Sequence, residues 1–412
     1  MEENRLWTDL PVDAFEEIMK HLPLKDYLGL RIICRSWKEL VSKAIANKNC
    51  CPSPELPLVF LQTKDPCFFF SLITKSIHHA KTLLLDRDHI CHGSVEGWLI
   101  VSDCSKEGCA TFFFWNPVTD VRIIIPSKLY FPFEIPVLDD RILYVTKMVA
   151  SSKPNSDGSE SDCYLVGLMT SFCHIAVYKL FDKSWTIIEP DKDSRICFMD
   201  VEIIGTKLFV TDSTSNSILV YDLKNSTNGP SKAEMMVKLP QVRPPESSMI
   251  GNHRIFIGLP KCYLAKDEVL GELYLIYMYG NMEYNTEHVE PDRSITLSTF
   301  VRPLCVTTVE VFKLDMNKNP IGWLNVKLDD KVAFVSSWKS IVMSRDERNY
   351  NKELTTRNSV YFLIDVPCPM NPRSSLRLGM FCLTESSTKC FPMKISKLCD
   401  VRYPFWFLPS IW

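Results

Sequence analysis

Apolar residues near the start of the chain recur at the spacing of one helical face, while charged residues between them fall on the opposite face. Pro11 suits the first helical position, because its missing N–H would be unbonded there anyway. Pro23 cannot continue the helix. The pattern therefore predicts a first helix with an apolar stripe made of Ala14, Phe15, Ile18, Met19 and Leu22.

Two more short helices can follow the first. Residues 24–30 can form a second one, and Ile33, Trp37, Leu40 and Val41 give a third apolar stripe. A unit of three helices between residues 6 and 41 buries little apolar surface, and chains below roughly 40 residues usually need a metal, disulfides or a partner. The segment contains no metal-binding pattern, so we expect it to depend on a partner.

Helical periodicity disappears after a Pro-rich stretch that we read as a linker, residues 46–57. Short runs of aromatic and β-branched residues replace it, separated by clusters of Asn, Asp, Gly, Ser and Pro. We expect residues 4–45 to form the helical unit and residues 58–412 to form a mainly β domain. The predicted strands are residues 67–72, 97–101, 111–115, 121–125, 142–146, 164–169, 174–179, 185–188, 207–211, 218–222, 273–278, 309–314, 360–365 and 378–383.

One hairpin plan, an apolar strand with an aromatic near its end followed by a turn and a second apolar strand, recurs five times. Its copies begin at Thr111, Ile175, Ile218, Val309 and Leu378. Tyr178 and Tyr221 are 43 residues apart, close to the ~40–50 residues of a four-stranded propeller blade. The remaining ~350 residues then correspond to roughly seven blades, with six or eight also open.

A closed ring would remove the free ends that a long row of hairpins leaves unpaired. The last twelve residues, Val401 to Trp412, are rich in aromatic side chains that would form an unusual apolar surface if exposed. We therefore expect this segment to be packed, and it is a candidate for the strand that closes the ring.

Composition excludes several classes of function. With 412 residues, 46% hydrophobic and 23% charged, the chain has room for one large globular domain and a small one. A formal charge of −2 gives no basic footprint for nucleic acid. The N-terminus lacks signal-peptide features, and no apolar run approaches the ~20 residues of a membrane span. We expect an intracellular protein, in the cytoplasm and/or nucleus, with no membrane partner.

The sixteen Cys residues include no CxxC pair, which favours reduced thiols packed as small hydrophobes. The nearest approach to a ligand cluster has a spacing that fits no common zinc module, so we expect neither a metal nor a cofactor. This cluster consists of His89, Cys91, His92, Cys104 and Cys109.

The N-terminal segment carries an ordered series of positions: Leu10-Pro11, acidic–apolar alternation to Ile18, residues 22–26, Leu28, Leu30, and Cys34-Arg35-x-Trp37. This series resembles an F-box. The resemblance implies docking on a Skp-family adaptor, which is held by a cullin in an SCF-type ubiquitin ligase. It implies Leu10, Pro11, Ile18, Leu22, Pro23 and Leu24 as the docking surface, Phe15 and Trp37 as at least partly inner core, and Leu28 and Leu30 as further candidates for adaptor binding.

A second motif series covers most of the remaining chain. It consists of Cys91-x-Gly93-Ser94-x-x-Gly97-Trp98-Leu99, Trp115-Asn116-Pro117, 178–185, 200–212, Tyr221-Asp222, Glu272-Leu273, 311–315 and Trp323. The series resembles the KIB-type β-propeller, which plants carry behind an F-box. Two stretches depart from it, residues 151–161 and 281–298, and we expect both to be exposed loops.

The chain contains no GxxxxGK[ST], GxGxxG, GxSxG or HExxH motif, so the usual phosphate, dinucleotide, hydrolase and zincin sites lack their first requirement. Strand-ending aspartates at 212, 222, 315 and 365 suit turn capping. Trp98, Trp185, Trp323 and Trp338 suit packing between blades.

These observations and the two resemblances together predict a non-catalytic substrate receptor of an SCF-type ligase, with an unknown protein as substrate. A propeller scaffold that acts without ubiquitination and a propeller enzyme are the alternatives.

Overall fold

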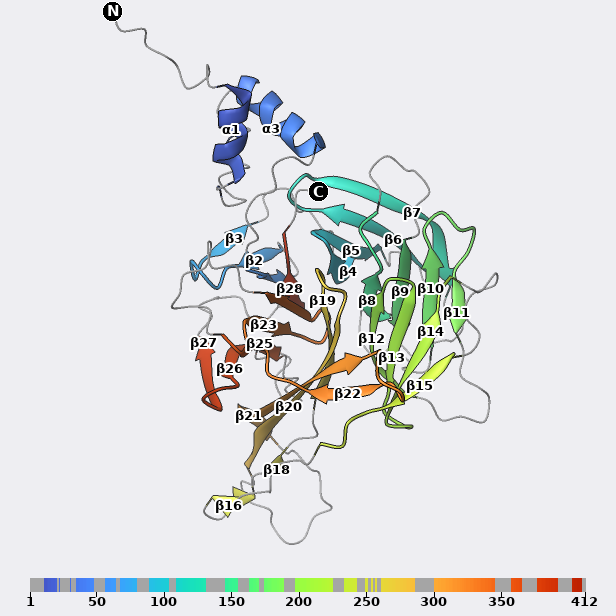
Figure 1. Cartoon of the computed structure of the whole chain (residues 1–412), viewed down its shortest axis with the longest axis vertical. Coiled ribbons are helices and arrows are strands. Elements are labelled where there is room, and N and C mark those ends of the chain that lie inside the picture. The colour runs from blue at the N-terminus through green and yellow to red at the C-terminus, as the bar shows by residue number, and fades with distance from the viewer. Residues whose placement is uncertain are drawn as a thin grey trace, which may run out of the picture.

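The computed structural model describes residues 11–20, 22, 30, 35–47, 56–63, 67–79, 89–103, 109–130, 145–154, 163–169, 174–188, 197–224, 233–242, 249–250, 253–254, 256–257, 261–285, 300–344, 357–364, 376–391 and 402–409. Strands dominate this part of the chain, and Figure 1 shows the helices α1 and α3 beyond one end of the sheets. The expectation of a mainly β fold behind an N-terminal helical unit is therefore confirmed.

Helix α1 spans Val12–Lys20 and helix α3 spans Arg35–Asn47. The Phe15 N–H donates to the Pro11 carbonyl over 3.0 Å, so Pro11 caps the helix and the first helical residue is Val12. This is one position later than the sequence predicts. The predicted second helix lies outside the described residues, except for Leu30, which is helical.

Four separate antiparallel sheets contain four strands each. The first holds β4 (His89–Val95), β5 (Trp98–Asp103), β6 (Cys109–Asn116) and β7 (Val121–Tyr130). The second holds β8 (Val145–Ala150), β9 (Tyr164–Met169), β10 (Ile175–Lys179) and β11 (Thr186–Ile188). The third holds β12 (Phe198–Ile204), β13 (Lys207–Asp212), β14 (Ser217–Asp222) and β15 (Met235–Lys238). The fourth joins β28 (Arg402–Phe407) to β1 (Leu58–Gln62), β2 (Phe68–Phe70) and β3 (Ile77–His79).

A ten-stranded sheet contains two further groups, linked by a short parallel pairing of β19 with β24. One group is β19 (Lys261–Asp267), β20 (Leu273–Asn285), β21 (Phe300–Asp315) and β22 (Gly322–Asn325). The other is β23 (Lys331–Val335), β24 (Ile341–Ser344), β25 (Ser359–Ile364), β26 (Arg377–Cys382) and β27 (Ser387–Phe391). Strand β18 (Phe256–Ile257) pairs with β20, while β16 (Met249–Ile250) and β17 (His253–Arg254) pair with each other.

The five hairpins seen in the sequence are confirmed, and they share one position in the fold. They are β6–β7, β10–β11, β14–β15, β21–β22 and β26–β27, the last two strands of each group. The hairpin plan is therefore the outer half of a repeating β-unit.

The innermost strands of the six described groups lie next to one another in a ring. Their order is β28, β4, β8, β12, β19 and β23, and β23 again contacts β28. Six hydrophobic clusters of the described residues fill the spaces between neighbouring groups. This arrangement favours six blades, one of the numbers left open; the blade number stays a prediction.

The C-terminal strand closes the ring, as the sequence suggests. Strand β28 pairs with β1, with Val59 opposite Trp406. Trp406 is fully buried, its indole N–H donates to the Val335 carbonyl over 2.9 Å, and its ring meets Phe334 edge-on. Residues from both ends of the propeller sequence therefore form one sheet.

One sequence prediction is wrong in part. Residues 281–285 are not loop but the end of β20, because β21 already begins at Phe300 and pairs with them. The remaining residues of that predicted loop, 286–298, and most of the other, 155–161, lie outside the described residues. Of the strand predicted at 142–146, residues 145–146 begin β8, which continues to Ala150, and residues 142–144 lie outside the described residues.

We expect Trp406→Ala to lower the free energy of unfolding by about 3–5 kcal/mol, because it removes a buried indole and leaves the Val335 carbonyl without its donor. Urea unfolding of the full chain measures this. Tyr130→Ala is the control, since Tyr130 is 69% exposed on the outer strand β7. Equal losses in both variants would contradict a role for β28 in closing the ring.

Candidate functional site

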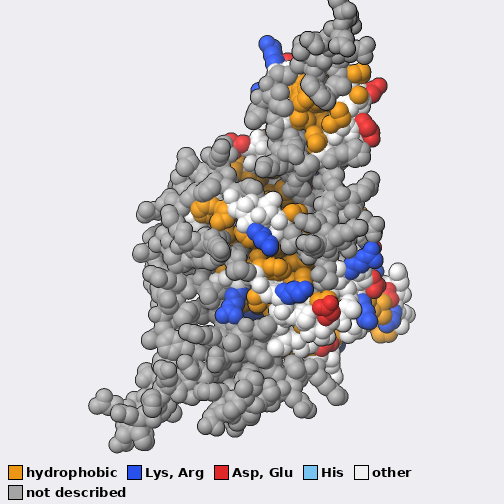
Figure 2. Space-filling view, turned by 90° about the vertical axis from the view of Figure 1, so that its left-hand side faces the viewer, with side chains coloured by type: hydrophobic (Ala, Val, Ile, Leu, Met, Phe, Trp, Pro, Cys, Tyr) orange, Lys and Arg blue, Asp and Glu red, His pale blue; other side chains and the backbone are white. Residues whose placement is uncertain are grey.

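The apolar stripe of α1 is divided between the inside and the outside of the helical unit. Phe15 and Met19 are buried, and the Phe15 ring meets Trp37 of α3 edge-on at 5.2 Å between centroids. Val12 and Ile18 are 51% and 42% exposed. Figure 2 shows hydrophobic side chains at the surface of this unit, at the top of the view. The helix therefore presents apolar surface that its own unit does not cover.

Six of the ten residues proposed for adaptor binding are described. Pro11 and Ile18 are exposed, Phe15 is buried, and Leu22, Leu30 and Trp37 are half-buried. The others, Leu10, Pro23, Leu24 and Leu28, lie outside the described residues. Val12 is an exposed apolar residue that the sequence reasoning missed; its position directly after the capping proline was the available signal.

The second candidate site is the polar centre of the ring. The innermost strands β4, β8, β12 and β28 each carry an extra residue relative to the next strand outward. Such β-bulges bend a strand and redirect its side chains. Polar residues at or beside them, including His92, Lys147 and Asp200, are buried near the centre as a result.

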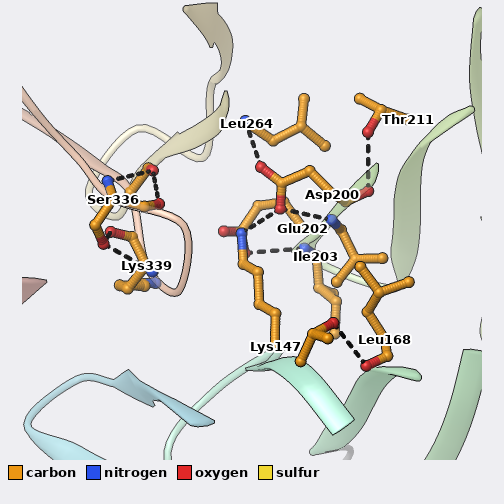
Figure 3. A network of polar contacts seen from close by, with 12 residues as sticks. Lys147, Leu168, Asp200, Glu202, Ile203, Thr211, Leu264, Ser336 and Lys339 are labelled. Atoms are coloured by element: carbon orange, nitrogen blue, oxygen red, sulfur yellow. Dashed lines mark hydrogen bonds and ion pairs between the residues drawn. The ribbon is translucent and has the colours of Figure 1, made fainter. Parts of the chain in front are cut away.

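Asp200 connects three innermost strands. Its Oδ1 lies 2.5 Å from Nζ of Lys147 on β8, and its Oδ2 accepts the N–H of Leu264 on β19 over 2.8 Å. Oδ1 also accepts the N–H of the next residue, Val201. Figure 3 shows this carboxylate between the strands. The cation and the two N–H donors offset the cost of burying this carboxylate.

A second ion-pair group joins the end of β19 to the turn between β23 and β24. Nζ of Lys339 is 2.7 Å from Oε1 of Glu268, and Nζ of Lys266 is 3.3 Å from its Oε2. Burial opposes the charge of Glu268, but Lys339 and Lys266 outweigh it and lower the pKa of Glu268 to about 2. Burial likewise opposes the charge of Lys339, yet Glu268 and Glu202 raise its pKa. Glu268 and Lys339 are therefore both charged at neutral pH and compensate each other's burial.

Glu202 is fully buried and only partly satisfied. Its Oε1 accepts the N–H of Ile203 over 3.0 Å, whereas its Oε2 has no hydrogen-bond partner among the described residues. Burying an oxygen without a hydrogen bond costs stability, and the nearby positive charge of Lys339 compensates part of that cost.

The innermost strand β4 approaches β8 very closely. A Cβ on Gly93 would lie 2.3 Å from the Met148 carbonyl oxygen, so only glycine fits. His92 beside it is buried, which lowers its pKa to about 3, and its Nε2 lies 2.6 Å from Oγ of Ser102. The imidazole is therefore neutral at physiological pH. Gly93 belongs to the motif series read from the sequence, but its close contact was not foreseen.

Several sequence interpretations of single residues are confirmed. Asp212 accepts the N–H groups of Thr214 and Ser215 in the turn after β13. Asp222 and Asp315 cap turns in the same way, and Asp365 lies outside the described residues. Trp185 stacks on Tyr178 and also contacts Phe112 of the neighbouring sheet, so it packs between blades.

The arrangement of the ring centre is that of a structural brace. Within the described ranges, no group of three or more His, Cys, Asp or Glu side chains is placed to hold a metal ion. Its lysines and carboxylates are paired with one another across strands β8, β12, β19 and the β23–β24 turn. Among the described helices, none is long and apolar enough to cross a membrane.

Family models match both parts of the chain. The model of the KIB1-4 β-propeller matches residues 69–384, well over half of the sequence. The chain belongs to this family. The model of the F-box domain matches residues 7–48, which include both helices. This protein is thus an F-box protein with a KIB1-4 β-propeller.

Two relatives have an F-box in their names. An F-box/kelch-repeat protein of Arabidopsis thaliana is 24% identical over 368 residues, covering 87% of this chain and 83% of the relative. A second F-box/kelch-repeat protein of this plant is 23% identical over 253 residues, covering 52% of this chain and 63% of the relative. A Bacteroides fragilis structure, provisionally described as a 6-phosphogluconolactonase, is 13% identical with a TM-score of 0.42 and covers 85% of this chain and 98% of its own. Similarity at that level carries no argument about activity.

The F-box, the β-propeller and the F-box/kelch relatives together support a role for this KIB1-4 protein as an F-box substrate adaptor. The relatives also suggest a non-catalytic adaptor.

We expect Lys147→Met to lower the free energy of unfolding by about 3–5 kcal/mol, because it leaves the Asp200 carboxylate buried without its cation. Lys153→Met is the matched control: its Nζ is 3.9 Å from Glu96 Oε2 and both side chains are at least 30% exposed, so the loss stays below about 1 kcal/mol. Urea unfolding distinguishes the two, and similar losses would argue against the brace.

We expect Glu268→Gln to flatten the pH dependence of stability below neutrality. The folded pKa of Glu268 is about 2 against an ordinary 4.5, so its contribution is present above pH 4.5 and is lost as pH falls from 4.5 toward 2. The free energy of unfolding at pH 7 minus that at pH 3 should therefore be smaller in the variant, measured by urea unfolding. Lys339→Met should reduce this difference too; an unchanged difference in both variants would refute the assignment.

Proposed function

We propose that this protein is the substrate-recognition subunit of an SCF-type ubiquitin ligase. The F-box binds a Skp-family adaptor and, through it, a cullin, while the propeller binds the protein to be ubiquitinated. The observation that carries the proposal is the exposed apolar part of α1 within the F-box match, which consists of Pro11, Val12 and Ile18. A helix that presents such a face suits docking into an apolar groove of a partner.

The proposed adaptor surface combines exposed contacts with a supporting core. Pro11 and Ile18 would touch the adaptor, together with Leu10, Leu22, Pro23, Leu24, Leu28 and Leu30. Phe15 and Trp37 would hold α1 against α3 through their edge-on contact. We propose residues 4–45 as the F-box, 46–57 as the linker and 58–412 as the propeller, working in the cytoplasm and/or nucleus.

The mechanism is proximity. A substrate held beside the ubiquitin-charged enzyme reacts at an effective concentration far above its concentration in solution. The chain then needs to supply geometry, not an acid, a base or a nucleophile. A propeller whose innermost strands are tied by buried ion pairs suits this task, because a rigid receptor keeps the substrate at a fixed position.

We expect Ile18→Asp to reduce recovery of a co-expressed Skp-family adaptor at least about tenfold, because a charge would have to be buried in an apolar groove. Quantitative co-purification with the full chain measures the effect. Ile124→Asp is the control: Ile124 is 75% exposed on β7 of the propeller, and its variant should recover the adaptor like the wild type.

Circular dichroism of both variants must match the wild type, so that loss of the adaptor is not loss of the fold. Equal adaptor recovery with wild type, Ile18→Asp and the double variant Leu10→Ala/Pro11→Ala would overturn the proposed function. The propeller would then act as a scaffold without ubiquitination.

A further inference from the structure

A pocket of about 420 Å³ opens between the β12–β15 sheet and the β19–β22 group of strands. Its walls come from the β12–β13 turn on one side and from the β19–β20 and β21–β22 turns on the other. The lining includes Lys207 and Phe209 on the first side and Glu272, Leu273, Lys313 and Leu314 on the second. Pockets of this size accommodate one or two side chains of a ligand.

The interior of this pocket is apolar and its rim is polar. Phe209, Leu273 and Leu314 are buried within the core between the two groups, while Met316 is 41% exposed at the rim. A bulky apolar side chain that entered this pocket would leave water for a largely apolar surface, and removing apolar surface from water is favourable.

One wall of the pocket is held rigidly. Oδ1 of Asp267 accepts the N–H groups of Val269 and Leu270, each over 3.0 Å, and Nζ of Lys331 joins Asp267 Oδ2 to Glu272 Oε2 at 2.8 and 3.0 Å. Burial opposes the charge of Glu272, but bonds from Lys313, Tyr274 and Lys331 lower its pKa to about 2, so it stays ionised. A wall fixed in this way loses little conformational freedom when a ligand binds.

The turn that forms this wall also displays two apolar side chains to solvent. Val269 is 88% exposed and Leu270 is 58% exposed, directly before Gly271 and Glu272 of the lining. Exposed apolar residues on a rigid turn beside a pocket extend the contact surface beyond the pocket itself. That surface suits a polypeptide better than a compact small molecule.

The lining carries two lysines and two acids, Glu272 and Asp315, so an acidic ligand group can pair only with the lysine that is least engaged. Lys313 is already engaged, with its Nζ 2.6 Å from Oε1 of Glu272. On the opposite wall, Nζ of Lys207 lies 4.0 Å from Oε2 of Glu234, and both side chains are at least 40% exposed. A loosely paired surface lysine can exchange its partner for a carboxylate of the ligand at little cost.

We propose that this pocket binds an extended segment of the protein substrate in which a bulky apolar residue is followed by an acidic one. The apolar side chain enters between the two strand groups, the acid pairs with Lys207, and the flanking chain lies against Val269 and Leu270. The proposal rests on the proposed function, because it supplies the substrate contact of that receptor.

The test uses fluorescein-labelled heptapeptides of the pattern Gly-Ser-X-Z-Ser-Gly-Gly, with Leu, Phe or Gly at X and Asp, Ser or Lys at Z. Fluorescence anisotropy with the full chain gives the affinities. We expect Leu or Phe at X to bind at least about tenfold better than Gly, and Asp at Z to bind about fivefold better than Lys. Lys207→Glu should reverse the preference at Z, and Met316→Ser should weaken the preference at X.

Matched controls separate the pocket from general charge and apolar effects. Lys183→Glu makes the same charge change at an exposed turn of another group, and Met236→Ser removes a 57% exposed methionine on β15. Both should bind the peptides like the wild type.

Absence of any preference, or equal effects of the pocket variants and the controls, would overturn the pocket proposal. Adaptor recovery, measured on the same preparations, tests the ligase proposal separately from the pocket proposal. Normal adaptor recovery without a peptide preference leaves the ligase proposal standing. Failure of the wild type to recover the adaptor refutes the ligase proposal without deciding whether the pocket binds the peptides.

Discussion

The pairing of β28 with β1 is the interaction on which the rest of the structure depends. It places the end of the propeller sequence beside its beginning, so that β28 contacts both β4 and β23 and the ring has no free end. Trp406 secures this pairing from inside, because its ring packs on Phe334 and its N–H bonds to Val335. Each hydrophobic cluster between neighbouring groups requires both of its sheets in place. Ring closure puts the sheet of β28 and β1 in place for the two clusters on either side of it.

Ring closure also explains the polar centre. Innermost strands converge, and their bulges bring Lys147, Asp200 and Glu202 into a region without water access. Apolar side chains would pack there with less specificity, whereas Asp200 can bond only a cation and correctly placed N–H groups. Buried ion pairs contribute little net stability, yet they penalise wrong registers strongly. The centre thus fixes how the strands are arranged relative to one another.

Most strands away from the ring centre could be predicted from the sequence, whereas most of the innermost strands could not. Strands such as β6 and β10 are continuous apolar runs next to turn residues, and their hairpins were visible. No strand was predicted at β4, β12, β19 or β23, because β4, β12 and β19 carry polar residues that face the ring centre, such as His92, Glu202 and Lys266. The pocket could not be predicted for another reason: Lys207 and Lys313 are more than a hundred positions apart in the sequence and come together only in the fold.

The propeller and the helical unit differ in how much of their apolar surface they bury. The propeller buries its aromatic residues in six clusters of its described part and braces its centre with ions, so it has little need of a partner. The described helices bury few apolar residues, chiefly Phe15, Met19 and Val41, and leave Val12 and Ile18 in water. Covering those side chains would stabilise the helical unit and the complex together. A chain built this way keeps its propeller rigid in isolation, while its helical part would gain stability from a partner that covers it.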